Sequence, residues 1–63
     1  MDKKFELFNN SGQSTGVDVV VIGDCINFEE CGRFIMDIYK DEVDGLIAVL
    51  QEIKKNYEDV ANV

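Results

Sequence analysis

Apolar and polar residues alternate through the first two thirds of the chain, which is the pattern of β-strands with two different faces. Residues 4–8 form a short aromatic-rich run, and residues 17–22 are rich in β-branched side chains. Two further strand-like runs, residues 25–29 and 33–39, follow after short interruptions that contain glycine. The pattern predicts four strands joined in chain order as an antiparallel meander.

The two glycine-containing interruptions predict how these strands pair. Gly23-Asp24 suits a two-residue type II′ turn, which would place Ile22 opposite Cys25, Val21 opposite Ile26 and Val19 opposite Phe28. Glu30-Cys31-Gly32 suits a three-residue loop with Gly32 in a bulge, which would place Glu29 opposite Arg33, Phe28 opposite Phe34 and Ile26 opposite Met36. Both turns then put one apolar set on the same sheet face: Val19, Val21, Ile26, Phe28, Phe34, Met36 and Ile38.

The last third of the chain has the three- and four-residue spacing of an amphipathic helix. The helix is predicted to begin near Asp41, a good N-cap, and Gly45 would let it approach the sheet closely. Its apolar stripe consists of Val43, Leu46, Ile47, Leu50, Ile53, Tyr57 and Val60. The expected fold class is therefore α+β, a single small domain over residues 1–63, with a ββββα order and the helix packed on one sheet face.

The other sheet face is expected to keep an apolar patch that no element of the chain covers. The predicted patch consists of Phe8, Val20, Ile22, Ile35 and Tyr39. Exposed patches of this kind mark interfaces, so we predict a homo-oligomer, a dimer or larger, or a protein partner on this face. The alternative is a sheet face that is partly solvated and has no partner.

Composition narrows the function. A hydrophobic content of 46% is that of a folded domain, but 63 residues make a marginal core, which favours oligomerisation. Thirteen acids against six bases give a net charge of −7, which argues against nucleic acid as a partner because phosphate binding needs clustered bases. No apolar run suits a membrane span, and two unpaired cysteines fit a reducing compartment, so we expect a cytoplasmic protein without a membrane partner.

Residue types that carry out catalysis are scarce. The chain has no histidine, and the spacing of Cys25 and Cys31 suits neither zinc nor, in the predicted register, a disulfide. Glu29 and Glu30 lie at a hairpin end where a catalytic cleft is not expected, and the acids at 41–44 are explained by helix capping. We therefore predict no catalytic residues, no metal site, no cofactor and no enzymatic activity.

The segment 9–16 is the one long polar connection, and it is the best candidate for a small ligand. It offers two glycines, three hydroxyls and side-chain amides, and loops of this composition can present backbone N–H groups to an anion such as a nucleotide. The candidate residues are Asn9, Asn10, Ser11, Gly12, Ser14 and Thr15, with Arg33 as a nearby cation. The alternative is a plain hairpin connection.

The predicted order of four antiparallel strands and a helix resembles the PC4-type single-stranded-DNA-binding fold. That resemblance implies a nucleic-acid-binding sheet, for which Phe8 and Tyr39 are present but the basic residues are few. The leading expectation is a small, acidic, oligomeric binding protein, of the phage or mobile-element inhibitor type, that blocks a host protein or sequesters a small anionic ligand. The alternatives are a PC4-like nucleic-acid binder and a small structural or assembly subunit.

Overall fold

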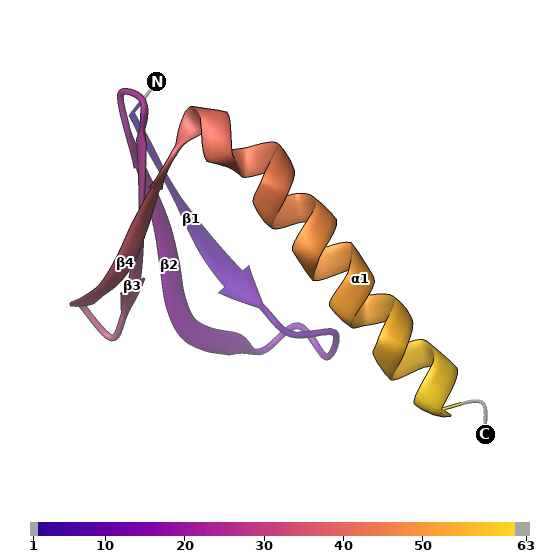
Figure 1. Cartoon of the computed structure of the whole chain (residues 1–63). Coiled ribbons are helices and arrows are strands. Elements are labelled where there is room, and N and C mark those ends of the chain that lie inside the picture. The colour runs from indigo at the N-terminus through magenta and orange to yellow at the C-terminus, as the bar shows by residue number, and fades with distance from the viewer. Residues whose placement is uncertain (1, 62–63) are drawn as a thin grey trace.

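Four strands and one long helix form the chain, as the alternating and helical patterns predict (Figure 1). The computed structural model describes residues 2–61, and the side chains of residues 2–59. The elements are β1 (Lys3–Phe8), β2 (Ser14–Ile22), β3 (Cys25–Glu30), β4 (Arg33–Tyr39), a 3-10 turn η1 (Lys40–Glu42) and α1 (Val43–Ala61). The strands make one open antiparallel sheet in the order β1-β2-β3-β4, so the α+β meander with a C-terminal helix is confirmed.

The hairpin of β2 and β3 has the predicted register. Ile22 pairs with Cys25, Val21 with Ile26 and Val19 with Phe28. Gly23 has a φ of 59°, as the first central position of a type II′ turn requires, and this conformation is open to glycine at little steric cost.

The hairpin of β3 and β4 differs from the prediction. Cys31 and Gly32 both have positive φ, 50° and 81°, which makes a two-residue type I′ turn, and Glu30 rather than Glu29 pairs with Arg33. The extra residue enters β4 instead, as a bulge at Ile35.

The bulge changes which side chains share a face. Beyond it, Phe28 pairs with Met36 and Ile26 with Ile38, so Met36 and Ile38 keep the predicted face. Phe34 pairs with Glu29 and leaves that face, because directly paired residues point to the same side of a sheet. The prediction for Phe34 was therefore wrong.

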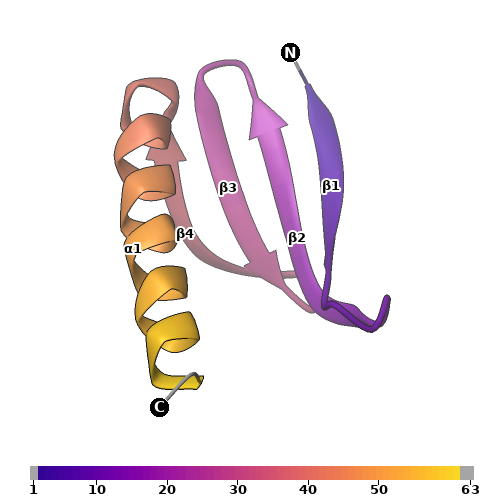
Figure 2. The same cartoon turned by 90° about the vertical axis from the view of Figure 1, so that its right-hand side faces the viewer.

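The helix touches the sheet only near its beginning. On β4, Ile38 is half-buried between exposed neighbours, and on α1 the half-buried side chains are Val43 and Leu46. These residues place α1 on the apolar side of the sheet. From there it diverges from the sheet (Figure 1), and it stands over β4 while β1, β2 and β3 stay open on that side (Figure 2). No atom lies within 4 Å of the position that a Cβ on Gly45 would occupy, so the predicted close approach of helix and sheet at Gly45 does not occur.

The chain does not close around a core of its own. Among residues 2–59 no side chain is buried, and the least exposed residues lie on the central strands. The Cα radius of gyration is 13.8 Å. A compact domain of this length would have a radius of gyration of about 11 Å. The fold is thus an open wedge of sheet and helix.

Candidate interaction surface

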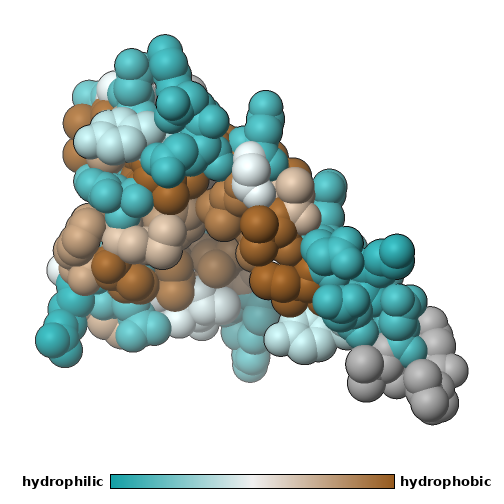
Figure 3. Space-filling view, viewed as in Figure 1, coloured by the Kyte–Doolittle hydropathy of each residue, from teal (hydrophilic) through white to brown (hydrophobic). Residues whose placement is uncertain are grey.

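The inner side of the wedge is apolar and uncovered. Figure 3 shows hydrophobic side chains gathered in the hollow between sheet and helix. We define the apolar hollow by the paired sheet residues of that side and by the helix stripe: Phe5, Val19, Val21, Ile26, Phe28, Met36 and Ile38 with Val43, Leu46, Ile47, Leu50 and Ile53. Leu50 is 54% exposed and Phe5 is 43% exposed, so both the helix and the sheet offer apolar surface to a partner.

From the sequence, we expected the helix of the same chain, rather than a partner, to cover this surface. The length of the helix stripe relative to the strands is the sequence feature that could have indicated otherwise. About five helical turns are roughly 27 Å long, whereas the six or seven residues of β1, β3 and β4 span about 20–23 Å, and only the nine residues of β2 reach about 30 Å.

The predicted interface residues lie in two groups on the second sheet face. Ile22 and Tyr39 flank Cys25 in one row across the sheet, and Val20 lies in the next row. Phe8, which pairs with Ser14, and the bulged Ile35 lie toward the opposite end of the strands. All but Val20 are about half exposed. The interface on this face therefore stays a prediction, and it would involve two apolar groups.

A row of carboxylates separates Phe8 from the first group, and the bulged Ile35 lies at the β4 end of this row. Glu6 pairs with Asp18 and Asp18 with Glu29, so three acids lie side by side across β1, β2 and β3. Lys4 Nζ lies 3.4 Å from Asp18 Oδ2 and compensates one of them. The second face thus carries a negative band between its apolar ends.

The polar connection between β1 and β2 uses its own N–H groups. Asn9 Oδ1 accepts hydrogen bonds from the amides of Ser11 at 2.9 Å and Gln13 at 3.0 Å. The amide of Gly12 donates to the carbonyl of Asn9 at 3.0 Å. Asn10 makes no hydrogen bond with the described residues. The amides of Ser11, Gly12 and Gln13 are therefore engaged within the turn, whereas those of Asn10 are not.

The rest of that connection is fixed to β1 and to the turn of β3 and β4. Thr15 Oγ1 donates to the Leu7 carbonyl at 2.8 Å, and Ser14 Oγ accepts from the Gly16 amide at 3.2 Å. The Cys31 amide donates to the Gly16 carbonyl at 2.9 Å. Arg33 follows this turn and pairs with Glu30 across it. The structure thus places the turn of Arg33 beside residue 16 at the end of the connection.

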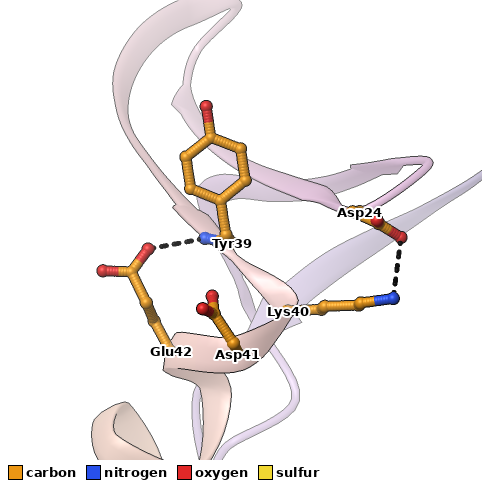
Figure 4. Close-up of a pocket in the computed structure, with 5 residues that line it drawn as sticks. All are labelled: Asp24, Tyr39, Lys40, Asp41 and Glu42. Atoms are coloured by element: carbon orange, nitrogen blue, oxygen red, sulfur yellow. Dashed lines mark hydrogen bonds and ion pairs between the residues drawn. The ribbon is translucent and has the colours of Figure 1, made fainter.

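An open pocket at the other end of the sheet surrounds the junction of β4 and α1 (Figure 4). Its lining residues are Asp24, Tyr39, Lys40, Asp41 and Glu42. Lys40 Nζ lies 3.4 Å from Asp24 Oδ1, and Glu42 Oε1 accepts a 2.9 Å hydrogen bond from the Tyr39 amide. Three carboxylates against one paired lysine make this pocket unsuited to an anion. No group of three potential metal ligands occurs among the described residues.

The two cysteines are free thiols in different surroundings. Cys25 is half-buried, and its Sγ lies 3.3 Å from Asn27 Oδ1 and 3.7 Å from Asp37 Oδ2. Desolvation, and then the charge of Asp37 and its hydrogen bond, raise the pKa of the Cys25 thiol. A thiol held protonated is a poor nucleophile. Cys31 is exposed at its turn.

Comparison with known proteins returned no match among family models, curated proteins or solved structures. Within residues 2–61 no helix combines the length and hydrophobicity needed to span a membrane.

Proposed function

We propose that this chain is a non-enzymatic, self-associating binding protein that acts by occupying the basic surface of another protein. The observation that carries the proposal is the uncovered apolar hollow in a chain with no buried side chain among residues 2–59. A surface of this kind is stabilised by association, because isolated folded chains rarely leave large contiguous apolar patches in water.

The charge of the chain favours one class of partner. The net charge of −7 and the carboxylate row of Glu6, Asp18 and Glu29 favour a basic protein surface. A small anion is disfavoured, because the Ser11, Gly12 and Gln13 amides of the β1–β2 connection are engaged internally and the junction pocket is acidic. The same carboxylate row argues against PC4-like binding of nucleic acid on this face.

The biological setting that suits such a protein is inhibition. A small acidic protein from a phage or mobile element would block a host protein by covering its basic surface. The free thiols fit the cytoplasm, where such a target would be met.

Two measurements test the proposal. Size-exclusion chromatography with light scattering should give a dimer or larger species at micromolar concentration. A monomer that unfolds cooperatively would overturn self-association.

The acidic surface is tested by salt-sensitive capture of basic proteins from a bacterial lysate. The double variant Glu6→Gln with Glu29→Gln should lose the captured protein. The matched variant Glu52→Gln with Asp59→Asn, which removes two charges from the helix, should retain it. Equal capture by both variants would overturn the role of the carboxylate row.

A further inference from the structure

Helix α1 is longer than β4, the strand beside it. Nineteen residues span about 28 Å of helix, whereas the seven residues of β4 span about 23 Å. Since α1 runs back from the end of β4, its last turns extend beyond the sheet (Figure 1). Tyr57, in those turns, is 73% exposed. This end of the helix therefore has no cover from β4.

The junction fixes the start of the helical segment. The Lys40 amide donates to the Asp24 carbonyl at 2.9 Å, and the Tyr39 amide donates to Glu42 Oε1 at 2.9 Å. These bonds hold the beginning of the turn η1 beside the β2–β3 turn. Beyond this point α1 diverges from the sheet, and the strands β1 to β3 stay open to another occupant (Figure 1, Figure 2).

The exposed area matches what a dimer of this size would bury. The chain exposes 5247 Å². A compact folded monomer of the same mass exposes about 4,100 Å². The surplus, on the order of 1,000 Å² per chain, is close to the roughly 800 Å² that each partner buries in a stable protein interface.

We propose that the occupant of the apolar hollow is helix α1 of a second copy, with each chain laying its helix on the sheet of the other. This inference rests on the self-association proposed above and specifies its geometry. Both surfaces needed for the contact, an apolar helix stripe and an apolar sheet face, are present and uncovered in the same chain. A two-fold arrangement buries both pairs at once, because the contact from the first chain to the second is repeated in reverse.

The charges of the chain are compatible with this docking. The central rows of the sheet face, from Phe5 to Met36 and from Val21 to Ile38, carry no charged residue. The charges of that face are Glu30 and Arg33 by the turn and Lys3 on the edge strand, whose Nζ lies 4.9 Å from the centroid of the Phe5 ring. A helix stripe can therefore lie over β2, β3 and β4 without burying an unpaired charge, with Lys3 at the rim over Phe5.

Disulfide trapping between two singly labelled chains tests the geometry. Both chains carry Cys25→Ala and Cys31→Asn; one adds Leu50→Cys on the stripe and the other adds Val19→Cys on the sheet. Because each chain has one thiol, only an intermolecular bond can form. After the chains are mixed, refolded and oxidised, we expect the mixed disulfide to form. Its yield should exceed by at least about tenfold that obtained when Glu52→Cys, on the opposite side of α1, replaces Leu50→Cys, since a disulfide requires Cα atoms within about 7 Å.

The outcomes separate the two proposals. A dimer by light scattering without the mixed disulfide would overturn helix exchange while self-association stands. A monomer would overturn both. If the first pair fails to fold by circular dichroism, the pair Ile47→Cys and Val21→Cys probes the same contact near the middle of the hollow. Absence of its mixed disulfide in a folded dimer would equally overturn helix exchange.

Discussion

Lys40 contacts Asp24 through both its side chain and its backbone. Its Nζ lies 3.4 Å from Asp24 Oδ1, and its amide donates to the Asp24 carbonyl at 2.9 Å (Figure 4). These contacts join the β2–β3 turn to the start of the helical segment. They therefore fix where the helical segment begins beside the sheet.

Removing the Asp24 carboxylate should cost little stability. Both side chains of the ion pair are about 70% exposed, at 72% for Lys40 and 70% for Asp24. We expect Asp24→Ala to lower the free energy of unfolding by less than about 0.5 kcal/mol, because water and salt screen the pair and the backbone bond remains. Urea unfolding at fixed chain concentration measures this, with Lys54→Ala, which breaks the exposed pair with Glu58, as the matched control. A loss far above that of Lys54→Ala would mean that the ion pair itself fixes the helix.

Replacing Glu42 should destabilise the fold more than replacing its neighbour Asp41. Glu42→Ala removes the acceptor of the Tyr39 amide, so we expect the free energy of unfolding to fall by about 1 kcal/mol. Asp41, which the sequence predicted as the N-cap, makes no hydrogen bond through its side chain with the described residues. Asp41→Ala should therefore change stability by less than about 0.5 kcal/mol. Equal losses in parallel urea titrations would contradict this assignment.

The two adjacent asparagines of the β1–β2 connection should behave differently. Asn9→Ala removes the acceptor of two backbone amides, and we expect a loss of about 1–2 kcal/mol. Asn10→Ala should be nearly neutral, since the Asn10 side chain makes no hydrogen bond with the described residues. Thermal unfolding at one protein concentration compares the two. Indifference to Asn9→Ala would show that the turn does not depend on this side chain.

Alanine substitution at two glycines should change the free energy of unfolding in opposite directions. Gly16 has a φ of 80°, and a Cβ there would lie 3.3 Å from Cys31 Sγ, so Gly16→Ala should cost about 1–2 kcal/mol. Gly45 lies in the helix with no atom near the added methyl, so Gly45→Ala should raise the free energy of unfolding by about 0.5–1 kcal/mol. Urea titration measures both. A destabilising Gly45→Ala would indicate that a partner approaches the helix at this point.

The thiols should react at different rates. A thiol reagent at pH 8 should modify exposed Cys31 well before Cys25, whose pKa is raised by desolvation and by Asp37. Asp37→Asn removes the charge and the charged hydrogen-bond acceptor that raise the pKa of Cys25, so it should speed the Cys25 reaction, while Cys31→Ser should abolish the fast phase. One phase for both thiols would contradict the difference in environment.

The folded state holds the Cys25 proton more tightly than the unfolded chain. The contribution of Cys25 to stability is therefore fully present below pH 9.0 and is lost as the pH rises above it.

The sequence predicted the sheet well where the turn chemistry was unambiguous. Gly23-Asp24 has few alternatives, and the register from Ile22 to Phe28 is as expected. At the next turn, glycine after Cys31 was compatible with either a three-residue loop or a two-residue type I′ turn. The type of turn depends on whether Cys31 adopts a positive φ, as it does here. Local sequence is a weak guide to this conformation in a residue other than glycine. One added residue then had to enter β4 as a bulge, and Phe34 changed face.

The candidate ligand residues show the same limit. The anion site at 9–16 stays a prediction, made from residue types that do not reveal which amides are already bonded. The Asn9 side chain engages them locally. In the same way, the patch predicted on the second face looked continuous in sequence, and pairing shows it divided by Glu6, Asp18 and Glu29.

By itself the sequence determined the strands, the helix, the first hairpin register and the acidic balance, since these follow from alternation, periodicity, glycine turns and residue counts. Only the tertiary structure decided that the helix does not close on the sheet. That outcome depends on the direction in which α1 continues from η1, a geometric fact that the hydrophobic pattern does not encode. An amphipathic stripe requires some apolar surface, but the pattern is the same whether that surface belongs to its own chain or to another.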